Sequence, residues 1–164
     1  MAMTIGMKNA VMTICDSVAE NLLRIKAAMI SPAKATISQG MRAIVDTMQT
    51  HDVERLVVAM GAGVSDPQDD PGLLDRIINL LLKLTARHVY EDMKRVADIV
   101  RNSDRAWTLV RAPMLTNDPG TGDVRVGYLG GDIGTRLSRE DMAMFMVRQL
   151  EDETYIHKAP VISN

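Results

Sequence analysis

Short apolar runs alternate along the chain with longer stretches in which apolar residues recur every three or four positions. Two of the runs, Arg55–Met60 and Ala106–Val110, lie between such amphipathic stretches, and Arg55–Met60 is continuous and β-branched. Continuous apolar runs of this length are typical of parallel strands buried on both faces. We therefore expect both runs to be parallel, buried core strands in adjacent layers. Further strands are expected at Ala10–Cys15, at Asp123–Tyr128 and, at an edge of the sheet, at Pro160–Ser163.

The amphipathic stretches predict helices over residues 17–29, 37–48, 73–84, 88–102 and 138–150. Two of them begin with a hydroxyl three residues before a carboxylate, at Ser17–Glu20 and at Ser138–Asp141. This pattern caps a helix N-terminus. Because strands and helices alternate along the chain, the order of elements indicates an α/β fold with a mostly parallel sheet.

Composition fits one globular domain over residues 1–164. Hydrophobic residues make up 46% of the chain, and 19 basic and 21 acidic side chains give a net charge of −2. This balance offers no general electrostatic attraction to nucleic acid or to an anionic membrane. No apolar run approaches the roughly 20 residues of a membrane span. Cys15 is the single cysteine and cannot form an internal disulfide, so we expect a reducing, cytoplasmic location.

The segment Gly61-Ala62-Gly63 follows a predicted parallel strand, at the sheet edge where α/β proteins bind ligands. Glycines at this edge let a ligand approach the backbone closely. The segment is not a dinucleotide fingerprint, because Asp66 stands where the third glycine would fall and a proline follows in place of a helix. The residues alone leave two interpretations, a tight exit from the strand and a ligand-binding loop, and they favour the strand exit.

Tyr90 and Lys94 have the Y-x-x-x-K spacing, which places both side chains on one face of a helix. A lysine so placed helps a tyrosine to donate a proton. The charged residues Glu91, Asp92 and Arg95 surround the pair and favour the alternative, a solvated helix face. No metal site is expected, because the three histidines are far apart and lack further ligands at useful spacing: His51, His88 and His157.

The most informative segment is Trp107–Thr116, WTLVRAPMLT, which resembles the W-T-[IL]-V-R-[PA]-P-x-L-T segment of NAD(P)H-binding atypical short-chain dehydrogenases. That group includes the NmrA-like proteins and the biliverdin reductase B/flavin reductase group. Four further segments are similar to family segments and follow in the family's order: Val53–Val64, Asp98–Ser103, Asn117–Val126 and Leu137–Leu150. The resemblance covers residues 38–164 and leaves residues 1–37 as a divergent N-terminal segment.

The resemblance implies a Rossmann-like three-layer sandwich that binds NADP or NAD and reduces a small-molecule acceptor, a flavin, quinone or similar conjugated compound. By position it implies these cofactor-binding residues: Met60, Gly61, Ala62 and Gly63 at the nicotinamide ribose, and Pro113, Met114 and Leu115 near the nicotinamide ring. Arg139 and Asp141 match a helix-opening pair that we interpret as structural. The catalytic residues are left unknown, with Tyr90 and Lys94 as the candidates.

The family's opening strand, glycine-rich loop and helix have no recognisable counterpart, since Gly6 is the only glycine before residue 38. We therefore expect an N-terminally shortened fold, whose open sheet edge a second copy of the chain could cover. A pyrophosphate that loses two charge-assisted hydrogen bonds, each worth roughly 1.5–3 kcal/mol, should bind about two to four orders of magnitude more weakly. Two alternatives to an enzyme stay open: a non-catalytic NmrA-like dinucleotide sensor and a truncated structural homologue.

Overall fold

The computed structural model describes residues 36–73, 80 and 87–164. The strand predicted at Ala10–Cys15 and the helix predicted over residues 17–29 lie outside this part of the chain. Of the helix predicted over residues 73–84, Leu73 and Leu80 are described, and both are helical. None of the described helices is long and apolar enough to cross a membrane.

The predicted elements within the described part all form, with their ends shifted by a few residues, and two short strands are added. In chain order the elements are α2 (Thr36–Thr50), β1 (Arg55–Gly61), α4 (Arg87–Arg101), β2 (Ala106–Ala112), β3 (Met114–Thr116), β4 (Arg125–Gly127), β5 (Arg136–Ser138), α5 (Arg139–Arg148) and β6 (Val161–Ser163). The additions are β3 and β5, which pair in parallel as a separate two-stranded sheet.

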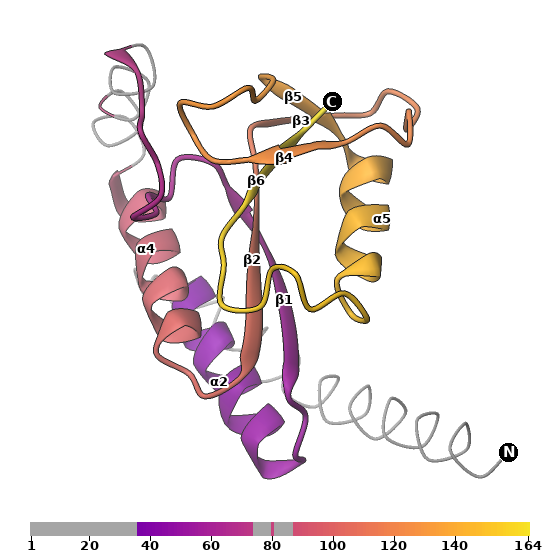
Figure 1. Cartoon of the computed structure of the whole chain (residues 1–164). Coiled ribbons are helices and arrows are strands. Elements are labelled where there is room, and N and C mark those ends of the chain that lie inside the picture. Colours follow the sequence, from indigo (N-terminus) through magenta and orange to yellow (C-terminus); the bar gives the residue numbers. More distant parts are fainter. Residues whose placement is uncertain (1–35, 74–79, 81–86) are drawn as a thin grey trace, which may run out of the picture.

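The main sheet has the strand order β1-β2-β6-β4 (Figure 1). β1 and β2 pair in parallel, from Arg55 opposite Ala106 to Gly61 opposite Ala112, so they are neighbours in one layer and the expectation of adjacent layers is wrong. β6 is parallel to β2 and antiparallel to β4. The prediction of an edge strand at the C-terminus is therefore also wrong, because the short strand β4 pairs along the outer side of β6.

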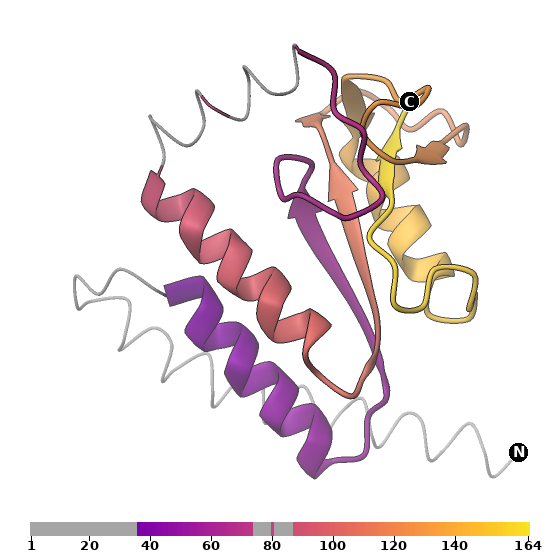
Figure 2. The same cartoon turned by 60° about the vertical axis from the view of Figure 1, so that its left-hand side comes forward.

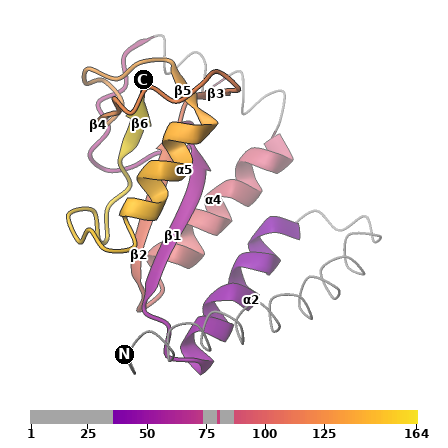
Figure 3. The same ribbon diagram turned by 90° about the vertical axis from the view of Figure 1, so that its right-hand side faces the viewer.

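The sheet lies between two layers of helix. α2 and α4 cover one face of β1 and β2, and α5 lies on the other face (Figures 2 and 3). Side chains along β2 alternate between the two layers, as the pleat of a strand requires. Trp107 and Leu109 join the core on the α4 side, whereas Val110 and Ala112 join the core on the α5 side.

β1 is less buried than β2. Leu56 and Met60 lie in the core, but Val57 and Val58 are half-buried and Ala59 is exposed. β2 is buried from Trp107 to Ala112. β1 has one partner strand in the described sheet, so the prediction of burial on both faces holds for β2 and not for β1.

Candidate functional site

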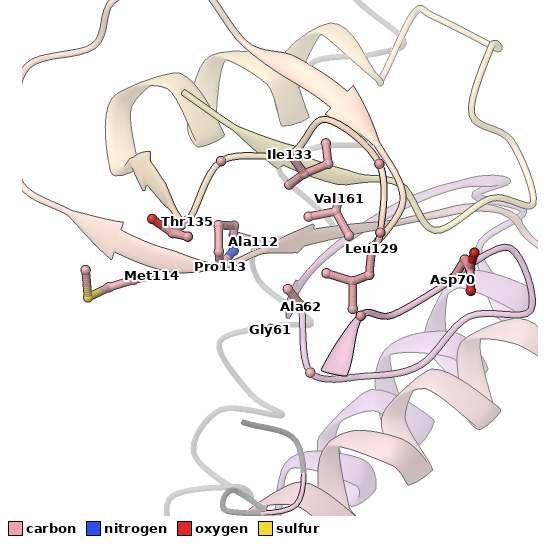
Figure 4. A pocket seen from close by; sticks show the side chains of 15 residues that line it. Gly61, Ala62, Asp70, Ala112, Pro113, Met114, Leu129, Ile133, Thr135 and Val161 are labelled. Carbon is pink, nitrogen blue, oxygen red and sulfur yellow. The ribbon is translucent and has the colours of Figure 1, made fainter. Parts of the chain in front are cut away.

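A cavity of about 700 Å³ opens at the carboxyl ends of β1 and β2 (Figure 4). Three segments form its walls: the loop after β1, the turn between β2 and β3, and the loop between β4 and β5. Its lining residues are Gly61, Ala62, Gly63, Asp70, Gly72, Ala112, Pro113, Met114, Leu129, Gly130, Gly131, Ile133, Gly134, Thr135 and Val161. Cavities that hold small molecules and cofactors have volumes of roughly 300–1,000 Å³, so this one has room for part of a dinucleotide together with an acceptor.

Five of the seven residues that the resemblance implied for the cofactor line this cavity: Gly61, Ala62, Gly63, Pro113 and Met114. The structure brings them together because β1 and β2 end side by side, where the Ala62 N–H donates to the Ala112 carbonyl at 2.7 Å. The other two lie elsewhere. Met60 points into the core beneath α4, and Leu115 packs against the core beneath α5.

Glycine gives the first wall an open surface. A Cβ placed on Gly61 would have the Met93 methyl carbon as its nearest neighbour, at 3.8 Å, so a small substituent would meet ordinary contact and a large one would fill cavity space. Pro113 and Met114 follow β2 directly, and the Met114 N–H donates to the Thr135 carbonyl at 3.2 Å. This bond joins the wall after β2 to the wall between β4 and β5.

The sequence analysis missed the wall between β4 and β5, which contributes Leu129 to Thr135. Gly130 has a φ of 94°, and a Cβ there would stand 1.8 Å from the Asp70 carbonyl oxygen. The Asp70 N–H in turn donates to the Leu129 carbonyl at 2.8 Å. The pair Gly130-Gly131 is a turn signal in the sequence, but nothing local to it says that the turn contacts a loop sixty residues earlier.

A buried ion pair lies behind the cavity and was also missed. Arg111 donates from its two terminal nitrogens to the two carboxylate oxygens of Asp69, at 2.7 and 2.8 Å. Arg111 is fully buried and also donates to the carbonyl oxygens of Val64 and Ala159, at 2.8 and 2.6 Å. Its guanidinium carbon is 5.9 Å from the ring centroid of Tyr128.

The charge of Asp69 is stabilised by these bonds. Burial by itself would raise the pKa of the carboxyl, but the hydrogen bonds from Arg111 and from the backbone N–H groups of Asp66 and Leu129 lower it below its usual range. The same burial raises the pKa of the neighbouring Tyr128 phenol, and the Asp66 charge adds to the effect. Asp69 thus stays ionised and accepts hydrogen bonds from both loops that line the cavity.

The carboxylate of Asp141 is also buried and accepts several hydrogen bonds. The backbone at Asp141 confirms the predicted helix cap. The Asp141 N–H donates to the Ser138 hydroxyl at the start of α5, at 2.9 Å. Its carboxylate accepts bonds from the backbone N–H groups of Thr121 and Gly122, both at 2.9 Å, and from the Asn164 amide at 2.8 Å. The N–H of Thr121 is the largest cause that lowers the pKa of Asp141 far below its usual range.

Tyr90 and Lys94 lie on α4, and neither is among the described residues that line the cavity. Tyr90 is half-buried and Lys94 is exposed. Their neighbour Asp92 is buried and accepts bonds from the N–H of Ile37 and the hydroxyl of Ser38 at the start of α2. The face around the pair is therefore not wholly solvated, because Asp92 joins α4 to α2.

The histidines do not come together either. His51 and His88 are exposed, and the His157 ring packs beside Trp107 with its centroid 5.6 Å away. Across residues 36–73, 80 and 87–164 no group of three or more His, Cys, Asp or Glu side chains could hold a metal ion.

The cavity lining suits an uncharged planar group better than a phosphate. Leu129, Ile133 and Val161 come together in it (Figure 4), and six of the other twelve lining residues are glycines. The lining residues that the structure describes include one charged side chain, the carboxylate of Asp70, and no cation. A nicotinamide ring with its carboxamide fits such a surface, whereas a pyrophosphate needs donors from another part of the chain.

Solved structures with the same fold come from several bacteria. The chain is 21% identical to a short-chain dehydrogenase/reductase from Veillonella parvula in complex with NADP, covering 77% of this chain and 58% of that one with a TM-score of 0.62. It is 12% identical to an oxidoreductase from Lactococcus lactis, covering 82% of this chain and 57% of that one with a TM-score of 0.62. It is 11% identical to an anaerobillin reductase from Escherichia coli O157:H7, covering 81% of this chain and 59% of that one with a TM-score of 0.56. These likenesses confirm the Rossmann-like fold.

The chain spans between 57% and 59% of the length of these three proteins. No curated protein matches it by sequence. Residues 9–153 match the profile of the NAD(P)H-binding family, a range that includes much of the segment before residue 38. Since the match covers most of the chain and agrees with the resemblance to atypical short-chain dehydrogenases, the protein belongs to the NAD(P)H-binding family.

Proposed function

We propose that the protein is an NAD(P)H-dependent oxidoreductase that reduces a flavin, a quinone or a similar conjugated acceptor. The observation that carries this proposal is the cavity at the carboxyl ends of β1 and β2, which is lined by glycines from two loops and by apolar side chains. Ligands of open α/β sheets bind at this edge of the sheet. The family match supplies the cofactor class, and among the similar structures one is a reductase.

In this proposal Gly61, Ala62 and Gly63 border the nicotinamide ribose, and Pro113 and Met114 lie along the nicotinamide ring. The cofactor supplies the hydride. The residues of this chain bind and orient the ring, and Leu129 and Ile133 exclude water from the space beside it. Thr135 places a hydroxyl at the same cavity, where it can donate a hydrogen bond to a carboxamide or a carbonyl group.

The shortage of acid-base groups at the cavity supports the proposed acceptor class. Among the described lining residues Asp70 has the only side chain that titrates, and it is exposed. Flavins and quinones delocalise the charge that they receive and can take their proton from water, so their reduction needs no general acid from the protein.

The first test measures cofactor binding. NADPH is titrated into the full chain by fluorescence, and reduction of riboflavin and menadione is followed at saturating NADPH. Gly61→Leu should weaken NADPH binding by about tenfold or more, because the side chain fills the space at the ribose. Ala143→Leu, at an exposed position on α5, is the control and should bind as the wild type does.

The outcomes separate the candidate functions. Equal NADPH affinity in wild type and Gly61→Leu contradicts the cavity as the cofactor site. Binding without reduction of any acceptor favours the non-catalytic sensor, for which the same shortage of acid-base groups is the supporting observation. Binding at micromolar concentration or tighter contradicts the expected loss of phosphate affinity and means that the segment before residue 38 supplies phosphate donors.

A further inference from the structure

We propose that Asp69 and Arg111 are positioning residues, which fix the distance between two walls of the cavity and thereby set the affinity for the nicotinamide end of the cofactor. This inference rests on the proposed function. Neither residue is among the lining residues, so neither is expected to touch the ligand. They act through the two loops that do line the cavity.

The two loops meet through two hydrogen bonds at Leu129, one to a side chain and one between backbone groups. The Leu129 N–H donates to the Asp69 carboxylate at 3.1 Å, and the Asp70 N–H donates to the Leu129 carbonyl at 2.8 Å. Gly130 then passes so close to the Asp70 carbonyl that no side chain fits between them. We call these contacts, together with the Asp69–Arg111 ion pair, the Asp69 clamp.

Arg111 attaches the clamp to the rigid part of the fold. It is a residue of β2, buried on all sides, and its third nitrogen bonds the Ala159 carbonyl just before β6. The Val64 carbonyl, on the loop after β1, receives a further bond from Arg111. One side chain in the central strand therefore holds both the loop that leaves β1 and, through Asp69, the loop that follows β4.

The clamp depends on a carboxylate at position 69. Its two oxygens accept bonds from both terminal nitrogens of Arg111 and from the N–H groups of Asp66 and Leu129. An asparagine has one accepting oxygen, and its NH₂ group would face these donors. The guanidinium and at least one loop N–H then share a single acceptor or lose their partner, which weakens the hold on the two loops.

Asp66 offers a matched control on the same loop. Its carboxylate is nearly as buried as that of Asp69, and it pairs with Arg101 at 3.0 Å. Arg101 belongs to α4, and among the described residues the Asp66 side chain has no hydrogen bond to the loop between β4 and β5. Asp66→Asn removes the same charge from the same loop but leaves the bond between the two cavity walls.

The experiment compares the wild type, Asp69→Asn and Asp66→Asn at a temperature where all three are folded, as urea denaturation verifies. NADPH is the probe for binding, and menadione reduction gives KM and kcat. We expect the dissociation constant and the KM for NADPH to rise about tenfold in Asp69→Asn and less than twofold in Asp66→Asn. The kcat at saturating NADPH should change less than threefold in both, because Asp69 touches neither reacting group.

Amide hydrogen exchange over residues 127–135, without ligand, gives a second and independent readout. Exchange should be faster in Asp69→Asn and unchanged in Asp66→Asn. If both variants lose affinity alike, or if exchange in Asp69→Asn matches the wild type, the positioning role is overturned. If the wild type itself neither binds NADPH nor reduces an acceptor, the proposed function fails, and the exchange result still decides whether Asp69 holds the two walls together.

Discussion

Asp69 and Asp141 are both buried acids that tie loops to the sheet, and the pKa of each is lowered, yet their partners differ. Asp69 is neutralised by a full positive charge on Arg111. The carboxylate of Asp141 accepts hydrogen bonds from neutral donors of the described residues, two of them backbone N–H groups, and from no cation among them. Its place at the start of α5, where the helix dipole favours a negative charge, adds to their effect.

The difference shows how each loop depends on the rest of the fold. The Asp141 cluster is local, because a capped helix and a turn about twenty residues earlier supply most of its donors. The Asp69 cluster needs a partner 42 residues away in β2. The cavity walls therefore depend on β2, whereas the Asp141 turn depends on the start of α5 and on Asn164.

The largest loss in the free energy of unfolding is expected from breaking the Asp69–Arg111 ion pair. Arg111→Met keeps a long side chain in the core but leaves the Asp69 carboxylate buried without its counter-charge, which costs about 3–5 kcal/mol of the free energy of unfolding. Urea denaturation at neutral pH measures the loss. Arg101→Met is the control, since its pair with Asp66 is partly exposed and should contribute about 1 kcal/mol or less. Equal losses would mean that burial of the Asp69–Arg111 pair adds nothing.

Removing the charge of Asp141 should lower the free energy of unfolding by less than the loss of Arg111 does, and this effect should depend on pH. Asp141→Asn turns one accepting oxygen into an NH₂ group that faces the donors of Thr121 and Gly122. The folded pKa of Asp141 lies below the unfolded value, so its stabilisation is present above about pH 4 and is lost as the pH falls further.

Denaturation of the wild type and of Asp141→Asn between about pH 6 and pH 2 checks this sign. The two unfolding free energies should approach each other as the pH falls, because the wild type loses the contribution that the variant lacks. The pKa of Asp69 is also lowered in the folded protein, but its contribution to the pH dependence is the same in the wild type and in the variant. A difference that stays constant over this range would contradict an ionised Asp141 in the folded protein.

The same contrast explains what the sequence could predict. The helix cap at Ser138–Asp141 and the strands β1 and β2 follow from local patterns, and all three form. The position of β6 inside the sheet and the Asp69–Arg111 pair depend on partners far apart in sequence, which periodicity does not reveal. The glycines after β1 were identified as a candidate site, whereas the wall from Leu129 to Thr135 was not, because its turn signals do not say which loop it contacts.

The smallest expected effect comes from two glycines, one in the Asp69 region and one in the Asp141 region, which can be compared under matched conditions. Gly130 beside Asp70 and Gly122 beneath Asp141 both have positive φ, at 94° and 73°. In that backbone region any L side chain costs roughly 1–2 kcal/mol, so Gly122→Ala, which meets no atom within 4 Å, should lose about that much. Gly130→Ala must in addition move the Asp70 carbonyl away from a Cβ at 1.8 Å, and should lose clearly more. Urea denaturation of the two variants under one set of conditions gives the difference directly, because the conformational cost is common to both. Equal losses would show that the loop after β1 yields freely at Asp70, and that the two cavity walls are not held at a fixed distance.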